Sequence, residues 1–163
     1  MWSKPHKTTG YFNAIDYVGH MMDGLYNTDV LTLAAGIEHI GRLSDPHGTA
    51  RKVSKLCGSW VEVDVCLKDG HISDFAQRLQ ACALGQASAA ILARYVIGAS
   101  PQEIREAREA LYAMLKQGGP PPRGRFADLA VLEGVRDYPA RHASTLLAFD
   151  ATLAAIEEAL EKL

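Results

Sequence analysis

The stretch "WVEVDVCLKDGHISDFAQRL", residues 60–79, decides the fold class of this 163-residue chain. After Trp60, the apolar side chains of Val61, Val63, Val65 and Leu67 alternate with Glu62, Asp64, Cys66 and Lys68. Such alternation is typical of a strand with one buried face. Asp69-Gly70 is a hairpin turn signal, so residues 71–79 can return antiparallel to the first strand. The sequence therefore predicts a β-hairpin.

Two helices are predicted directly after the hairpin. Small helix formers fill "ACALGQASAAILARYVIG", residues 81–98, and Gly98 can end this helix. Ser100, Pro101 and Glu103 form the pattern of a capping box with proline at the first helical position. We predict that the second helix begins there and runs to about residue 117.

The C-terminal segment, residues 139–162, lacks glycine and predicts a long helix. Its apolar residues recur every three or four positions, at Leu146, Phe149, Leu153, Ile156, Leu160 and Leu163. This spacing is typical of an amphipathic helix whose apolar face lies on the core. Strands followed by helices predict the α+β class, with a long C-terminal helix.

The chain before the hairpin contains a short predicted helix and an N-terminal extension. Thr28 is a cap-like residue and Gly36 a stop signal, so a helix is expected over residues 28–35. Residues 1–24 carry more large apolar side chains than a typical solvated tail, so we expect them to dock on the domain itself or on a partner. The predicted organisation is an extension, residues 1–24, and one domain, residues 25–163.

Composition excludes several classes of function. The 17 basic and 19 acidic residues leave a formal charge of −2, and no basic cluster is interleaved with aromatic residues, so a nucleic-acid partner is not expected. No apolar run approaches the ~20 residues of a membrane span, and the N-terminus resembles neither a secretory signal nor a transit peptide. Three cysteines, an odd number, indicate a reducing compartment, so a cytoplasmic protein is expected.

Two of the cysteines are candidates for a thiolate role. Cys57 precedes Gly58 at a loop-to-strand junction, and Cys82 lies where a strand gives way to a helix. The ends of elements are where side chains can converge on a site, and a helix N-terminus would also stabilise a thiolate at Cys82. Two thiolates without a CxxC spacing do not define a metal site, so buried, inert cysteines stay an open alternative.

The remaining candidates are weaker. Cys66 lies in the middle of a predicted strand, where packing or partial exposure is expected. His142 lies near the start of the C-terminal helix, where it is either a solvated or capping histidine or a metal ligand. The sequence contains no convincing nucleophile–base set, phosphate loop or HExxH pair, so an enzyme with its own complete chemistry is not expected.

Several separate motifs resemble one protein family. Residues 25–59, "LYNTDVLTLAAGIEHIGRLSDPHGTARKVSKLCGS", are similar to the opening of the iron–sulfur cluster assembly scaffolds of the IscU/NifU/SufU type. Residues 81–98 resemble that family's cysteine-containing helix, and residues 126–151, "FADLAVLEGVRDYPARHASTLLAFDA", resemble its SufU branch. The resemblance implies a SufE/NifU-like α+β fold, with a three-stranded antiparallel sheet covered by helices and its first strand in "TARKVSKL".

The resemblance also implies a site. Scaffolds of this family gather three cysteines and an aspartate, which hold a nascent cluster or a zinc ion and receive sulfur from a cysteine desulfurase. Cys57 and Cys82 match the first two cysteines, whereas Ser59 replaces the aspartate and Ser144 the third cysteine. Because a neutral hydroxyl is a poor metal ligand at neutral pH, the resemblance implies only half of the usual donors.

Three hypotheses follow for the function. The first is a cluster assembly scaffold that binds or relays a cluster or sulfur through Cys57 and Cys82, with a homodimer supplying four thiolates. The second is a degenerate scaffold fold without a cofactor. Such a protein would be a structural or regulatory subunit of a larger complex, for example a regulator that occupies the docking surface of a desulfurase. The third is zinc binding by Cys57 and Cys82, with His142 or a water completing the shell.

Overall fold

The predicted hairpin forms in the computed structural model, which describes residues 25–163. Strand β2, Trp60–Lys68, pairs antiparallel with β3, His71–Gln80. Asp69 and Gly70 connect them with φ values of 53° and 76°, the positive values that the two central residues of a type I′ turn require. The expected extension, residues 1–24, lies outside the described residues.

A third strand completes the sheet. Strand β1, Gly48–Val53, pairs antiparallel with β2, which gives the order β1-β2-β3. The strand was expected within "TARKVSKL", and it ends at Val53, because the N–H of the following residue, Ser54, donates to the Ser59 carbonyl and closes a turn. The three-stranded antiparallel sheet is therefore confirmed.

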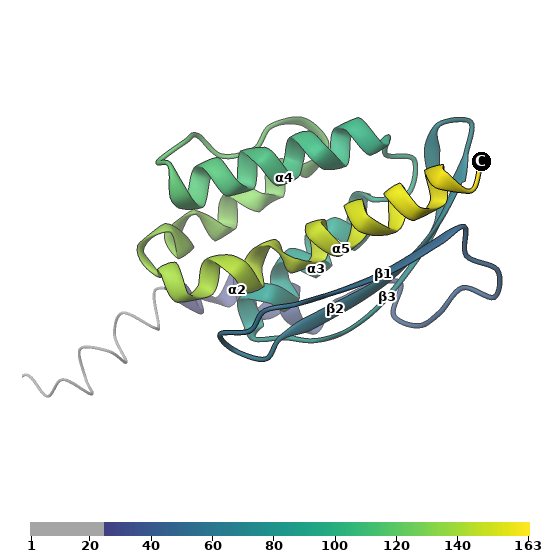
Figure 1. Ribbon diagram of the computed structural model, residues 1–163. Helices are drawn as coiled ribbons and strands as arrows, with labels where there is room; N and C mark the ends of the chain where they lie inside the picture. Colours follow the sequence, from purple (N-terminus) through teal and green to yellow (C-terminus); the bar gives the residue numbers. More distant parts are fainter. Residues whose placement is uncertain (1–24) are drawn as a thin grey trace, which may run out of the picture.

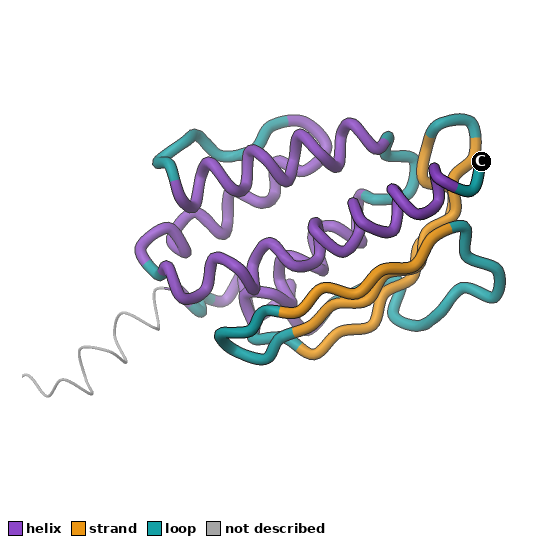
Figure 2. Tube along the Cα trace, viewed as in Figure 1, coloured by secondary structure: helices purple, strands orange, loops and turns teal. Residues whose placement is uncertain are grey.

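The helices form layers against this sheet (Figures 1 and 2). The long helix α5, His142–Glu161, packs against β1 and β2, and both α3, Ala83–Tyr95, and α4, Pro101–Lys116, pack against α5. The short α2, Thr28–Ala35, lies against α3. None of the helices in the described residues is both long and apolar enough to cross a bilayer.

Most predicted helix ends lie within a few residues of the observed ones. The capping box of α4 is confirmed, since Ser100 Oγ accepts from Glu103 N at 3.1 Å and Glu103 Oε1 accepts from Ser100 N at 3.2 Å. The cap of α2 was placed one residue late: Asn27, rather than Thr28, caps the helix by accepting from Val30 N. Helix α3 ends at Tyr95, before Gly98.

The segment between α4 and α5 forms 3₁₀ turns. Element η1, Gly124–Asp137, is interrupted at Phe126, and η2, Pro139–Arg141, directly precedes α5. The long helix therefore begins at His142, three residues after its predicted start, because Pro139–Arg141 forms a separate turn.

The apolar stripe of α5 differs from the prediction at its C-terminal end. Leu160 is 46% exposed and Leu163 is 85% exposed, whereas Ala155 and Ala159 are buried. Strand β1 begins so close to α5 that a Cβ atom on Gly48 would lie 1.9 Å from the Ala155 carbonyl oxygen. The face of α5 that meets β1 therefore carries the small residues Ala155 and Ala159. Leu160 and Leu163 lie outside this contact and outside the core.

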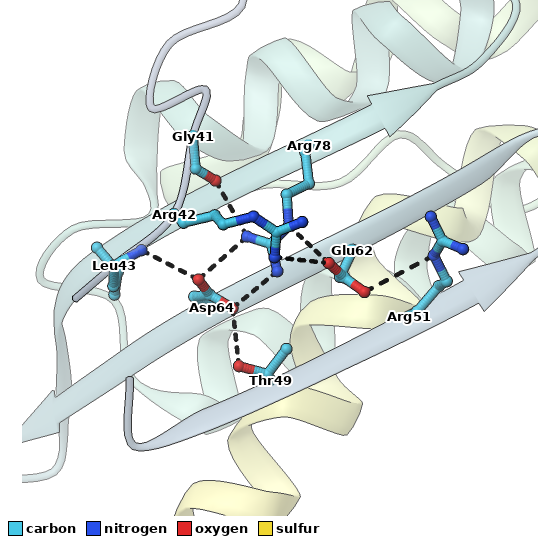
Figure 3. A network of polar contacts seen from close by, with 8 residues as sticks. All are labelled: Gly41, Arg42, Leu43, Thr49, Arg51, Glu62, Asp64 and Arg78. Carbon is cyan, nitrogen blue, oxygen red and sulfur yellow. Dashed lines mark hydrogen bonds and ion pairs between the residues drawn. The ribbon is translucent and has the colours of Figure 1, made fainter. Parts of the chain in front are cut away.

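The outer face of the sheet carries a network of charges (Figure 3). Asp64 was expected on the exposed polar face of β2, but it is only 3% exposed. Two guanidinium nitrogens of Arg78 donate to its carboxylate at 3.0 Å, and Leu43 N donates to it at 3.0 Å. Arg78 also donates to the Gly41 carbonyl and to Glu62. The loop that contains Gly41 and Leu43 is thereby held over the sheet and covers Asp64.

Candidate functional site

Cys57 and Cys82 lie at the same end of the sheet. The last residue pair between β2 and β3 is Trp60 with Gln80, so the segments that carry the two cysteines leave the sheet side by side. Both cysteines line one shallow cavity of about 230 Å³. Its lining consists of Cys57, Gly58, Ser59, Gln80, Ala81, Cys82 and Arg141. The structure thus brings together the two thiols that the sequence singled out.

The Cys57 loop, residues 55–58, projects from the sheet between two buried serines. Ser54 N donates to the Ser59 carbonyl at 2.8 Å, and Gly58 N donates to the Ser54 carbonyl at 2.9 Å. Ser54 and Ser59 are 3% and 4% exposed, whereas all four loop residues are exposed. Cys57 Sγ lies 3.1 Å from Ser59 Oγ and 3.5 Å from Ser54 Oγ. The thiol is therefore accessible and flanked by two fixed hydroxyl groups.

These hydroxyl groups shift the acidity of Cys57. Hydrogen bonds from Ser59 and then Ser54 favour the thiolate and outweigh the effect of partial burial. The positive charge of Arg141 acts in the same direction, and together they lower the pKa of Cys57 from 9.0 to about 7. A pKa near neutrality makes the thiolate, the nucleophilic and metal-binding form, available at physiological pH.

Cys82 is held at a contact between two helices. It is the N-cap residue of α3, and its carbonyl accepts from Gln86 N at 2.9 Å. Its Sγ lies 3.5 Å from Ser144 Oγ on α5. The two helices approach closely here because residue 85 is glycine: a Cβ atom on Gly85 would lie 3.1 Å from the Ser144 carbonyl oxygen. Cys82 therefore occupies a well-packed position beside the cavity.

The two serines at family ligand positions lie beside the cysteines. Ser59 contacts Cys57, and Ser144 contacts Cys82. Ser144 is buried, and its hydroxyl also donates to the Arg141 carbonyl at 3.1 Å. The positions that the resemblance assigned to the site thus lie together in two pairs, with hydroxyl groups in place of a carboxylate and a thiol.

His142 and Cys66 do not join this group. His142 is buried, and its Nε2 lies 2.9 Å from the Val135 carbonyl oxygen and 3.1 Å from the Arg136 carbonyl oxygen. The ring thus binds the C-terminal end of η1, and His142 is not among the residues that line the cavity. Cys66 lies towards the other end of β2, with its Sγ 3.5 Å from the Asp45 carbonyl oxygen.

Within residues 25–163, no three His, Cys, Asp or Glu side chains are grouped closely enough to hold a metal ion. The cavity offers two soft donors from one chain, the thiols of Cys57 and Cys82. Two thiolates supply half of the four donors of a structural zinc site or of an iron–sulfur cluster. Any such cargo would need further donors from a second molecule or from solvent.

Sequence reasoning missed two residues of the site. Arg141 lines the cavity and lies three positions before Ser144, within the stretch that resembles the SufU branch, and this was the signal that could have identified it. Ser54 lies at the base of the Cys57 loop, and its position depends on how the loop closes. No local pattern marked it.

A larger hollow of about 430 Å³ lies between α4 and the segment Pro120–Pro122. Its lining includes alanines of α4 and several charged side chains, but neither cysteine nor histidine. The thiols are therefore found at the smaller cavity.

Comparison with solved structures identifies the family. A nitrogen-fixing NifU-like protein (N-terminal) from Brucella abortus superposes with a TM-score of 0.85 and 52% sequence identity, covering 88% of this chain and 99% of that chain. The chain belongs to the IscU/NifU/SufU-type scaffold family. No family model matches the chain, and no curated protein matches it.

Two more distant structures share the NifU-like fold of this chain. An iron–sulfur cluster assembly scaffold protein for the SUF system from the thermophilic Fervidobacterium islandicum AW-1 has a TM-score of 0.75 and 20% identity, covering 82% of this chain and 98% of that chain. A hypothetical protein has a TM-score of 0.73 and 24% identity, covering 83% of this chain and 98% of its own. The expected NifU-like α+β fold is therefore confirmed.

Proposed function

We propose that the chain is an iron–sulfur cluster assembly scaffold in which Cys57 and Cys82 hold the sulfur or the cluster under assembly. The observation that carries this proposal is the shared cavity of the two thiols. It is supported by the 52% identity to the NifU-like protein. The pKa of Cys57, about 7, supplies a thiolate at neutral pH without a dedicated base. In this role the protein accepts and holds cargo and is not an enzyme.

The number of thiols in one chain favours cluster assembly between two copies. A [2Fe–2S] cluster takes four thiolates, and the cavity of one chain supplies two. Ser59 and Ser144 hydrogen-bond to the thiols and leave the soft-donor count unchanged. We therefore propose a homodimer that is bridged by its cargo, with Cys57 and Cys82 contributed by each copy.

A cysteine desulfurase is the proposed source of sulfur. Transfer of a persulfide sulfur requires that an acceptor thiolate reach into the partner's site, and Cys57 lies on an exposed loop. The neighbouring Leu56 is 78% exposed and Val53 is 55% exposed, so apolar surface flanks the thiol. Three free thiols suit the reducing cytoplasm, where we propose that the protein acts.

Anaerobic reconstitution with iron and sulfide tests the function. We expect the Cys66→Ser variant, which keeps both cavity thiols, to give the visible absorption of a cluster like the unaltered protein. Cys57→Ser and Cys82→Ser should each remain colourless, because one chain then supplies a single cavity thiolate. Colourless protein in all four cases would refute the proposal, and one zinc per chain as purified would favour zinc as the resident ion.

The N-terminal extension, residues 1–24, is proposed to dock on the partner. Its support is the content of large apolar residues, such as Trp2, Tyr11 and Phe12. A chain that begins at residue 25 should keep the thermal unfolding midpoint of the domain but lose affinity for an immobilised cysteine desulfurase. Unchanged affinity would contradict this assignment while leaving the cluster proposal intact.

A further inference from the structure

We propose that Cys57 and Cys82 form a persulfide-resolving dithiol: Cys57 carries a sulfane sulfur, and Cys82 releases it as sulfide by forming a disulfide with Cys57. This inference rests on the proposed function, because it assumes that Cys57 receives a persulfide sulfur. It assigns different roles to two thiols that the family resemblance treats as equivalent ligands. It also supplies the two electrons that convert sulfane sulfur to the sulfide of a cluster.

The first observation is the pairing of the thiols. Both line the same cavity, on segments that continue from the last β2–β3 residue pair, Trp60 with Gln80. The third thiol, Cys66, lies six residues along β2 from Trp60, a distance of about 20 Å at ~3.3 Å per residue. Cys82 is therefore the one cysteine of the chain that is positioned to attack a sulfur carried by Cys57.

The second observation is the difference in mobility that packing allows. The Cys57 loop, residues 55–58, is exposed and is tied to the sheet at its base by the hydrogen bonds between Ser54, Gly58 and Ser59. A Cβ atom on Gly58 would meet no other residue within 4 Å, so the loop has space to turn. Cys82, in contrast, lies where α3 contacts α5. A loop thiol can thus be loaded by a partner and then turn towards a fixed thiol.

The third observation is the charge beside the thiols. Arg141 lines the cavity and lies close enough to Cys57 to favour its thiolate. A guanidinium group in this position stabilises the hydrosulfide anion as it leaves. Within the described part of the chain, the cavity lining contains no carboxylate that would oppose this charge.

The reaction is balanced within the protein. The Cys82 thiolate attacks Cys57 Sγ, the bond between Cys57 Sγ and the sulfane sulfur breaks, and that sulfur leaves with the bonding electron pair as HS⁻. The new bond is the Cys57–Cys82 disulfide, and the proton of the Cys82 thiol passes to solvent. The two cysteine thiols are oxidised and the sulfane sulfur is reduced. A cellular dithiol must then reduce the disulfide before either thiol can hold cargo again.

Inorganic polysulfide serves as the sulfur donor for the test. The fully reduced Cys66→Ser variant, which retains the two cavity thiols, is treated without oxygen, desalted and examined by intact-protein and peptide mass spectrometry. A sample without polysulfide controls for oxidation by other routes. We expect a disulfide that links Cys57 to Cys82, and, in an assay made before desalting, about one equivalent of sulfide per chain beyond what a variant without Cys82 releases.

The matched variant Cys66→Ser/Cys82→Ser should instead keep the additional sulfur on Cys57 and release about one equivalent less sulfide per chain, namely only what the loading of Cys57 liberates from the polysulfide. A persulfide that persists on Cys57 while Cys82 is present, or a Cys57 that takes up no sulfur, would overturn the inference. Neither result depends on iron. If the inference fails while reconstitution with iron and sulfide still yields a cluster, the proposed function stands.

Discussion

Beside Cys57, position 59 holds a serine where the resemblance places an aspartate, and this hydroxyl group changes the chemistry of the Cys57 thiol. A carboxylate at position 59 would repel the thiolate and raise the pKa of Cys57, whereas the Ser59 hydroxyl donates a hydrogen bond to the thiolate and lowers it. Ser59 is therefore more than a lost ligand. The serine removes a carboxylate that could bind metal and adds a hydroxyl group that lowers the pKa of Cys57.

Ser59→Ala is expected to raise the pKa of Cys57 from about 7 towards its ordinary value of 9.0, because Ser59 is the largest cause of the shift. Alkylation by iodoacetamide reports the thiolate, so its rate falls as the pH drops through the pKa. Measured in a Cys66→Ser/Cys82→Ser background, the midpoint of this profile should move to higher pH. Ser54→Ala should give a smaller shift in the same direction, and an unchanged midpoint in Ser59→Ala would contradict this cause.

At Ser144, the missing donor can be restored. Ser144 Oγ lies 3.5 Å from Cys82 Sγ, so Ser144→Cys adds a third thiol next to that of Cys82. Three thiolates form a much better zinc site than two, and zinc affinity should rise at least about tenfold, equal to about 1.4 kcal/mol. Competition with a chromophoric chelator under reducing conditions measures this. Thr145→Cys changes a buried neighbour that lies about 100° around α5 from position 144, so this variant is the control and should leave the affinity unchanged.

At the scale of elements, the outer-face network depends on one arginine. Arg78 pairs with the buried Asp64 and with Glu62, and its loss would leave a carboxylate buried without its partner. We expect Arg78→Met to lower the free energy of unfolding by about 3–5 kcal/mol in a denaturant titration. Arg42→Met removes an exposed pair with the same Glu62 and should cost less than about 1 kcal/mol. Similar losses in the two variants would contradict this ranking.

The same network predicts how stability depends on pH. Burial alone would raise the pKa of Asp64, but hydrogen bonds from Arg78, Thr49 and Leu43 outweigh it and hold that pKa below its usual range. The hydrogen bond from Arg78 likewise lowers the pKa of Glu62. The stabilisation is therefore complete above the ordinary carboxyl pKa values and is lost as the pH falls below about 4. The unfolding free energy of Arg78→Met should decline less steeply over that acidic range.

Elements with strong local signals were predictable from sequence. The Asp69-Gly70 turn and the capping box at Ser100 depend on a few adjacent residues, and both formed as expected. Burial of Asp64 was not predictable, because it depends on Arg78 and on a loop some twenty residues away. For the same reason, Cys57 and Cys82 could be identified by their places at element ends, whereas Ser54 and Arg141 required the folded chain.

For the whole molecule, a cluster between two copies predicts a change of oligomeric state. Since each chain supplies two cavity thiolates, one [2Fe–2S] cluster should accompany two chains. Native mass spectrometry of reconstituted Cys66→Ser protein should show a dimer with one cluster, and removal of the iron with a chelator should return the monomer. A coloured monomer with one cluster per chain would contradict the shared arrangement.

Helix α5 spans the molecule between two points where glycine allows close contact (Figure 1). Near one end the backbone of β1 at Gly48 touches Ala155, and near the other Gly85 of α3 touches Ser144. These contacts lie eleven residues apart along α5, or about 16 Å at ~1.5 Å per residue. Each contact brings two backbones so close that neither glycine has room for a side chain unless α5 moves. A larger residue at position 48 would therefore have to displace α5, the helix that also carries Ser144 beside Cys82, although position 48 is remote from the cavity.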